Sequence, residues 1–556
     1  MSRIKLEILE LIPKRKIILF LIVIGIISLL FKLYTVDFSL PFRGDNLFYT
    51  LEALQYSQGD FFIHQKTNPG WSLFISSFLW LFNSDNFIDY SNLVRVLSLS
   101  VMSFTILPIY LLARKFFDQK YSLVTVILFA FEPHLNYIAG RGVSEPLFIL
   151  IIVFTFLFIL DKKPIYIFLS FILSGIFWWM RLEGFYLFII ISIIYLLSFR
   201  KSRNLIRNYG ICIAIFLIIV SPMFVQRDMQ YGDPFYIWYG ETLFTENYAN
   251  LQTSPSDASF FSYVEEHGTL SFIDTFVLQG ISNLSNELIN ISYPYLFILL
   301  PFGILFSLRA FDQNKEYIRA NWILILTILA TLVIPFSIIT DQRFLFVLLP
   351  FLVIFATIPI QRITEYGLST FSFNQHQKNI FLIIVILLVV ILSGIFTHGY
   401  DKYGYGQPDT IKEHEKMEYA RFLVDNLDGL MLDGGYVTEY VKTVKYTDTA
   451  ELFKNYKSPR GKDPFPDTYT PGNLVMIREY GKTLEELISN GEKSGLKYIG
   501  ISEDGADMLL FLDDVYSHEE NYPYLIKISD STAEGYQKLK VKVFRIDYEI
   551  FHQNLD

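Results

Sequence analysis

The chain has 556 residues, of which 52 % are hydrophobic and 18 % are charged, whereas a soluble domain usually carries about 25 % charged residues. Its formal net charge is −9, its mean hydropathy is +0.37, and its single cysteine rules out an intrachain disulfide. These values exclude a soluble enzyme, a disordered chain and a nucleic-acid-binding protein, and they indicate a polytopic membrane protein.

Apolar stretches long enough to cross a membrane follow one another through the first 400 residues. A spanning helix needs roughly 17–25 mostly apolar residues. The apolar stretch 71–82 is shorter than this, which predicts a helix lying at the membrane surface. Eleven stretches qualify as spans: 17–36, 93–113, 121–139, 142–160, 164–180, 184–199, 208–226, 288–308, 320–340, 344–361 and 379–398.

The distribution of lysine and arginine predicts how these spans are oriented. With the N-terminus in the cytoplasm, the inner segments hold 19 Lys and Arg, whereas the outer side of the membrane half holds seven. Because basic loops favour the cytoplasmic side, we expect 37–92 and 227–287 to be large outer loops. Eleven spans would then place the C-terminal region outside. We expect the membrane to be the plasma membrane of a prokaryote.

The composition changes after residue 400, where a Gly- and Tyr-rich linker predicts a domain boundary. From there on, 29 Asp and Glu outnumber 19 Lys and Arg. The pattern predicts a membrane domain over 1–400 and a small extracytoplasmic α/β domain over 401–556. The elements expected in that domain are helices over 411–426 and 483–489 and strands over 474–477, 498–501 and 540–546.

Charged residues cluster at the outer ends of the predicted spans. Charges at membrane depth cost about 2.5–3.5 kcal/mol or more, so they are usually paired or functional. Because all the clusters fall on the same side, we expect one polar cavity that opens outward near the outer leaflet. The clusters are Arg43 with Asp45, Asp60 with His64 and Lys66, Arg141 with Glu145, Arg181 with Glu183, and Asp341 with Arg343.

Asp45 stands directly before a predicted helix over 46–58, in which Leu47, Leu51 and Leu54 share one face. An aspartate in that place most often caps the helix N-terminus. The alternative is a general base at the membrane surface, since an aspartate is ionised near neutral pH and can accept a proton.

The other charged candidates also have two interpretations each. Glu145 either begins a helix, where an acid is favoured by the helix dipole, or serves the reaction. Arg181 either forms a local ion pair with Glu183 at a turn or binds an anion. Arg343 either anchors its span at the lipid headgroups or binds a phosphate, which its guanidinium matches in geometry.

A series of short motifs in the first outer loop resembles a known family. It runs Asp45-Asn46-Leu47-Phe48-Tyr49, Ala53, Gly59-Asp60-Phe61 and Asn68-Pro69-Gly70-Trp71. This series resembles the first outer loop of the GT-C superfamily of membrane glycosyltransferases, in particular the polyprenyl-phosphate-sugar users such as protein O-mannosyltransferases and lipid A aminoarabinose transferases. The stretch Gly232-Asp233-Pro234-Phe235 is similar to a motif in the large outer loop of that family.

The resemblance implies roles for particular residues. Asp45 takes the place of the catalytic aspartate of the family, and Glu145, within Ser144-Glu145-Pro146, matches its second functional carboxylate. Arg343, followed by Phe344, matches a pattern associated with the lipid phosphate. Further candidates for binding the substrate or its phosphate are Arg141, Arg181, Lys66 and Asp60. Asp45-Asn46 departs from the Asp-Glu common in protein mannosyltransferases, and the Trp-Trp-Asp signature of oligosaccharyltransferases is missing.

The implied reaction is an inverting transfer of a sugar from a polyprenyl (dolichyl) phosphate to a hydroxyl of a protein, lipid or glycan at the outer face of the membrane. A transporter or lipid-linked sugar flippase is the alternative, although charges are scarce at the middle of the predicted spans, where transporters often carry them. A third possibility is that the spans only display the acidic C-terminal region. The sequence has no metal-ligand spacing, and it leaves open whether a divalent metal takes part.

Overall fold

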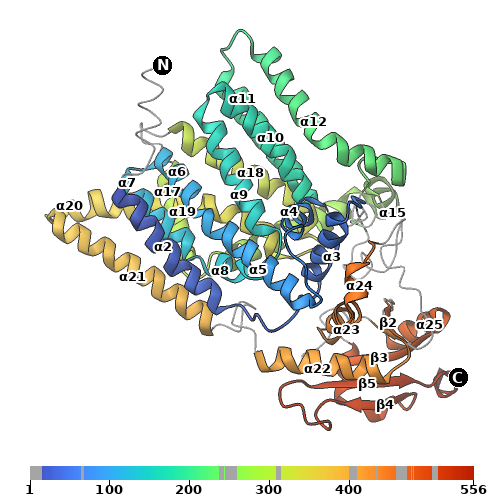
Figure 1. Cartoon of the computed structure of the whole chain (residues 1–556). Coiled ribbons are helices and arrows are strands. Elements are labelled where there is room, and N and C mark those ends of the chain that lie inside the picture. The colour runs from blue at the N-terminus through green and yellow to red at the C-terminus, as the bar shows by residue number, and fades with distance from the viewer. Residues whose placement is uncertain are drawn as a thin grey trace.

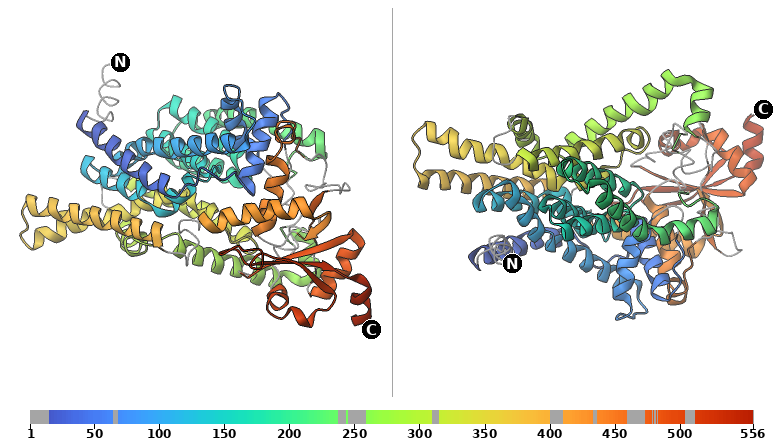
Figure 2. Two further views of the ribbon diagram at one scale, coloured as in Figure 1. Left: turned by 60° about the horizontal axis from the view of Figure 1, so that its bottom comes forward. Right: turned by 90° about the horizontal axis from the view of Figure 1, so that it is seen from above.

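The computed structural model describes residues 15–63, 68–236, 243–244, 259–308, 315–399, 410–432, 436–458, 473–477, 479, 481, 483–503 and 511–555. Helices make up the membrane half, and a small sheet with its own helices lies at the end of the bundle opposite the N-terminus (Figure 1). The two further views in Figure 2 show the same separation of the N-terminus from the sheet. The predicted boundary at residue 400 lies outside the described residues.

Each of the predicted spans overlaps one or more helices. Several of these helices, such as α9 and α11, are apolar all round, which suits a position inside a bundle or in lipid. The helices are α2 (Arg15–Tyr34), α5 (Phe87–Phe104), α6 (Ile106–Phe116), α7 (Gln119–Ala130), α8 (Pro133–Ala139), α9 (Glu145–Asp161), α10 (Pro164–Met180), α11 (Phe185–Phe199), α12 (Leu205–Tyr231), α17 (Leu296–Leu308), α18 (Lys315–Phe336), α19 (Leu349–Arg362) and α21 (Gln375–Gly399).

The predicted count of eleven spans is not confirmed. Within the described residues, seven helical segments are long and apolar enough to cross a membrane, or up to eight if one bent pair counts as a span. That pair is α7 and α8, which meet at an angle of 56°. The bend has a local cause, because Glu132 caps α8 and Pro133 is its first residue. Three shorter apolar helices are α4, α10 and α17.

The first outer loop forms two short helices that pack against each other, α3 (Asp45–Ser57) and α4 (Gly70–Leu79). The structure therefore starts the first helix one residue earlier than predicted, so that Asp45 belongs to the helix. Its N-cap residue is Gly44, and no side chain caps it. The interpretation of Asp45 as an N-cap was wrong.

The remaining short helices connect the longer ones or precede them. A 3₁₀ helix, η3 (Gln342–Leu348), leads into α19, and a second, η1 (Leu182–Gly184), leads into α11. The others are α15 (Phe260–Phe272), η2 (Ile273–Leu278), α16 (Gln279–Asn290), η4 (Ile363–Gly367) and α20 (Leu368–Thr370).

The C-terminal region contains a five-stranded mixed sheet of order β2-β1-β3-β5-β4. Strand β1 pairs in parallel with β2 and β3, whereas β5 pairs antiparallel with β3 and β4. Strands occur where three were predicted, and β1 and β4 had not been predicted. The strands are β1 (Gly429–Leu432), β2 (Leu474–Ile477), β3 (Leu496–Ser502), β4 (Leu525–Asp530) and β5 (Val541–Ile546).

Helices cover both faces of this sheet. Side chains of α22 (Thr410–Asn426) and α23 (Tyr436–Thr447) share one buried cluster with the sheet. The other face is covered by α25 (Leu484–Ser494), α26 (Phe511–Ser517) and α27 (Tyr548–Leu555). A short helix, α24 (Ala450–Lys454), extends toward the bundle, where its Phe453 ring packs against Phe87 and Tyr90 of α5.

Candidate functional site

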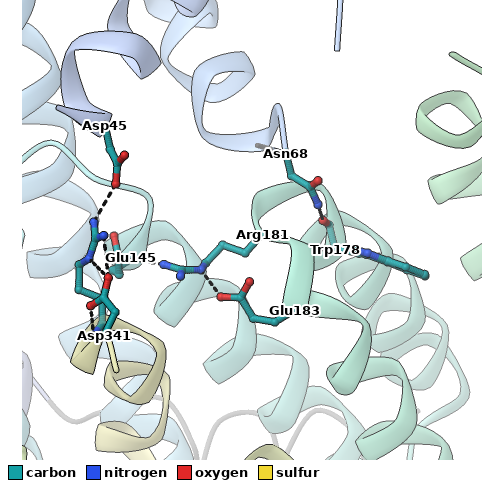
Figure 3. Close-up of polar contacts among 8 residues, drawn as sticks. Asp45, Asn68, Glu145, Trp178, Arg181, Glu183 and Asp341 are labelled. Atoms are coloured by element: carbon teal, nitrogen blue, oxygen red, sulfur yellow. Dashed lines mark hydrogen bonds and ion pairs between the residues drawn. The ribbon is translucent and has the colours of Figure 1, made fainter. Parts of the chain in front are cut away.

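Asp45 and Arg343 meet at one end of the bundle although they lie 298 positions apart. The Asp45 Oδ2 atom lies 3.1 Å from a terminal nitrogen of Arg343. Asp341 accepts hydrogen bonds from Nε of the same guanidinium at 2.8 Å and from the backbone N–H of Arg343 at 2.9 Å. Asp341 therefore fixes the direction of the Arg343 side chain, and Figure 3 shows Asp341 and Asp45 near each other.

This first pair remains accessible. The Asp45 side chain is 58 % exposed and the Arg343 side chain is 36 % exposed. Asp341 is more enclosed; burial by itself would raise the pKa of its carboxyl, but the Arg343 guanidinium lowers that pKa below its ordinary value. Asp341 is thus the permanent counter-ion of Arg343, which leaves the Asp45 carboxylate open to another partner.

A second pair lies beside the first. Glu145, the first residue of α9, accepts a hydrogen bond from Arg181 at 2.7 Å, and Arg181 also pairs with Glu183. Glu145 is buried, and within the described residues its second oxygen, Oε2, has no hydrogen-bond partner. A buried acceptor that stays unpaired costs about 1–3 kcal/mol, which is typical of a place where a ligand completes the hydrogen bonding.

Aromatic side chains join the two pairs into one site. The Arg181 guanidinium lies over the Phe344 ring at 4.7 Å, and Phe344 directly follows Arg343. Burial raises the pKa of the Tyr49 hydroxyl, and the negative charges of Asp45 and Glu145 raise it further, so Tyr49 is a neutral group within the influence of both carboxylates. The structure therefore brings Asp45, Glu145, Arg343 and Arg181 into one neighbourhood, and Figure 3 shows Asp45, Glu145 and Arg181 there.

Arg141 differs from the other arginines of this neighbourhood. Its guanidinium stacks on the Tyr137 ring at 4.1 Å and donates to the Tyr137 hydroxyl. Burial lowers the pKa of Arg141 to about 10, and the positive charges of Arg43 and Arg343 add to that effect. In the described part of the chain Arg141 forms no ion pair with a carboxylate, so its charge is available to an anion, whereas Arg181 is already neutralised by two glutamates.

Two predicted groupings were wrong. Arg43 pairs with Glu413 and Glu439 of the C-terminal region and not with Asp45. Arg141 does not pair with Glu145, whose partner is Arg181.

Asp60 lies apart from the site, because its carboxylate pairs with Lys457 at 3.3 Å. The other members of its predicted grouping, His64 and Lys66, lie outside the described residues. The stretch around Gly232 ends α12, and the Asp233 side chain accepts a hydrogen bond from the backbone of Phe235.

One polar group behind the site was not predicted. Asn68, just before α4, donates to the carbonyl of Trp178 and accepts from the buried Arg227 at 2.8 Å (Figure 3 shows the first contact). It ties the first outer loop to α10 and α12. No local sequence pattern indicates it, because its partners are 110 and 159 positions away.

A metal site is not evident in the part of the chain that the structure describes. No group of three or more His, Cys, Asp and Glu side chains is placed to hold a metal ion there. His134 pairs with Glu132 inside the bundle.

Comparisons with known proteins place this geometry in context. Residues 66–225 match the profile of the dolichyl-phosphate-mannose-protein mannosyltransferase family. That range includes Glu145, Arg141 and Arg181 but neither Asp45 nor Arg343. No curated protein sequence matches the chain.

Solved structures share its fold. An oligosaccharyltransferase of Archaeoglobus fulgidus, in complex with Zn and sulfate, is 14 % identical with a TM-score of 0.57, over 92 % of this chain and 72 % of that one. The oligosaccharyltransferase AglB of the same organism, in complex with an inhibitory peptide and a dolichol-phosphate, is 13 % identical with a TM-score of 0.56, over 89 % and 72 %. ArnT of Cupriavidus metallidurans, bound to undecaprenyl phosphate, is 12 % identical with a TM-score of 0.49, over 95 % and 98 %.

Proposed function

We propose that this chain, a GT-C superfamily membrane glycosyltransferase, transfers a sugar from a polyprenyl phosphate to a hydroxyl group of an acceptor with inversion at the anomeric carbon. The observation that carries the proposal is the meeting of Asp45 with Arg343 at an accessible place at the outer end of the helices. A carboxylate and a guanidinium so placed offer a proton acceptor and a phosphate ligand a few ångströms apart.

Arg343 and Arg141 would bind the phosphate of the donor. Arg343 is oriented by Asp341, so it can turn its free face to a phosphate without losing its position. Arg141 contributes a positive charge that forms no ion pair with a carboxylate within the described residues. Negative charge develops on the phosphate as the sugar leaves, and preorganised cations stabilise that charge in the transition state. A dolichol-phosphate bound to AglB is consistent with a donor of this class.

Asp45 would act as the general base. The acceptor oxygen forms a bond to the anomeric carbon, the bond from that carbon to the phosphate oxygen breaks, and the polyprenyl phosphate leaves. The proton of the acceptor hydroxyl goes to the Asp45 carboxylate. Glu145, whose second oxygen is unpaired in the described structure, would accept a hydrogen bond from the sugar or the acceptor and hold it in place.

The acceptor we favour is a hydroxyl of a protein, because the family profile that matches residues 66–225 describes protein mannosyltransferases. A lipid or glycan hydroxyl would use the same chemistry. The transfer would take place at the outer face of the membrane, since the distribution of basic residues puts the loop that carries Asp45 on that side. The acceptor, the sugar and this orientation belong to the proposal.

A transfer assay tests the reaction. The purified protein is reconstituted in vesicles with a radiolabelled mannosyl polyprenyl phosphate and a Ser/Thr-rich peptide. We expect label on the peptide, with the anomeric configuration inverted relative to the donor. Movement of the labelled lipid between leaflets without any labelled product would instead favour the flippase.

A further inference from the structure

Helix α23 of the C-terminal region lies directly on the segment that carries Asp45. Thr443 donates a hydrogen bond to the carbonyl of Phe42 at 3.2 Å. Arg43 donates to Glu439 at 2.5 Å, and a Cβ added at Gly44 would lie 3.5 Å from the same glutamate. Each residue of the stretch before Asp45 therefore meets α23.

That stretch needs an external support. Helix α3 has no side-chain N-cap, and its N-cap residue Gly44 has a φ of 57°, in the left-handed region. A helix end without a capping side chain frays more readily. The direction of the Asp45 carboxylate therefore depends on what holds the residues before it.

Two elements hold this stretch from opposite sides. On the bundle side, the backbone N–H of Phe42 donates to Ser91 of α5 at 3.1 Å, and Arg95 lies over the Phe42 ring at 4.4 Å. On the other side, Arg43 is the main link, because Glu413 of α22 lies 3.3 Å from it in addition to Glu439. The three charges form a network that is largely enclosed, with the Arg43 side chain 24 % exposed.

We propose that the Arg43–Glu439–Glu413 contact makes the C-terminal region part of the catalytic apparatus, with Arg43 as a positioning residue that fixes Gly44 and thereby aims Asp45 at the acceptor. The proposal rests on the proposed function, because it concerns the same carboxylate. It assigns the C-terminal region a role in the rate of transfer itself, in addition to any binding of an acceptor.

The charges around Arg43 favour a stable ion pair with Glu413 near neutral pH. Burial by itself would raise the pKa of Glu413, but the charges of Arg43 and Lys416 lower it below its ordinary value, so the carboxylate stays ionised around neutral pH. Removing Arg43 would take away the cation that Glu413 and Glu439 share, leaving Lys416 as the ion-pair partner of Glu413, and the two like charges would then repel more strongly.

A matched pair of variants tests the proposal in full-length protein. Arg43→Met should lower kcat about tenfold while the KM for the lipid donor changes less than about twofold, because a carboxylate that is misdirected by about an ångström loses rate and not donor binding. Arg43→Lys should restore part of kcat. Lys454→Met removes another link between the two regions, the contact with Asp85, and should leave kcat within about twofold of wild type.

A gentler variant guards against misfolding of Arg43→Met. Thr443→Val keeps the shape of the side chain but removes the hydrogen bond to Phe42, and we expect a loss of about threefold in kcat at unchanged KM. If Arg43→Met and Thr443→Val both keep the wild-type kcat, or if Lys454→Met lowers kcat equally, the positioning role is wrong. If the wild-type protein itself transfers no sugar, the proposed function fails instead, so the two failures are distinguishable.

Discussion

Two polar clusters lie within the membrane half, one around Lys32 and one around Asp45, and they differ in whether the charged groups have hydrogen-bonding capacity left for a further partner. In the inner cluster the Lys32 ammonium donates to Ser28, to Asn136 at 2.8 Å and to the carbonyl of Ala130 at 3.4 Å. Lys32 is 2 % exposed, and all three of its N–H groups have a partner. In the site, by contrast, the Asp45 side chain is 58 % exposed and Glu145 Oε2 lacks a partner in the described structure.

The difference teaches that a charge at membrane depth does not by itself mark a reactive site. Lys32 serves the fold, because it accepts no further partner and holds the carbonyl at the end of α7, where α7 and α8 bend apart. The Asp45–Arg343 pair differs, because part of it stays exposed to solvent. A bound phosphate or acceptor can therefore form the hydrogen bonds that the pair itself leaves unmade.

Among the variants that test this comparison, the largest effect on the rate of transfer is expected at Arg343. Arg343→Ala removes the proposed phosphate ligand, and kcat/KM for transfer should fall about 10²–10³-fold, as for other preorganised groups that meet developing negative charge. Arg343→Lys keeps the charge but loses the bidentate geometry and should recover only part of the rate. A variant with less than about threefold loss in a steady-state transfer assay would remove Arg343 from this role.

At Lys32 the expected effect is on stability. Lys32→Met would remove the Lys32 donor from the buried Asn136 Oδ1, at a cost of about 1–3 kcal/mol, whereas the Ala130 carbonyl would keep its hydrogen bond from Ser28 at 2.6 Å. A thermal unfolding scan of the detergent-purified protein should show a lower midpoint, while kcat per folded molecule stays within about twofold of wild type. A large drop in kcat at unchanged stability would mean that the inner cluster belongs to the reaction.

The smallest effect is expected at Asp60, which the sequence placed among the binding residues. Its partner Lys457 is 52 % exposed, and surface ion pairs of this kind contribute about 0–1 kcal/mol. Asp60→Asn should therefore change both the unfolding midpoint and the kinetic constants of transfer very little. A loss of donor affinity, measured as a rise in KM above about tenfold, would mean that Asp60 does bind the donor.

Much of the fold followed from composition and periodicity. Apolar length predicted the membrane helices, and short apolar runs together with one alternating stretch predicted three of the five strands, because these patterns are local. The fold predicted from the motifs that begin at Asp45 is shared with solved oligosaccharyltransferase structures, and residues 66–225 match the mannosyltransferase profile, whereas the glycosyltransferase activity of the chain remains a prediction. The count of spans is not confirmed, since a broken pair such as α7 and α8 cannot be told from a single span by hydropathy.

Pairings across the chain were harder to predict. The sequence predicted that Arg43 pairs with its neighbour Asp45, whereas in the structure Arg43 pairs with Glu439, which is 396 positions away. Glu145 likewise pairs with Arg181 and not with the nearer Arg141. Such choices depend on how helices dock, which no local spacing encodes. The roles of Asp45, Glu145 and the arginines remain predictions.

The most direct test of the central claim is the transfer rate of Asp45→Asn. This substitution keeps the size of the side chain and removes the proposed proton acceptor, and Asp60→Asn serves as its matched control. With a mannosyl polyprenyl phosphate and saturating peptide, we expect kcat of Asp45→Asn to fall about 10²–10⁴-fold while the unfolding midpoint stays at the wild-type value. Transfer by Asp45→Asn at the rate of the control would contradict the account.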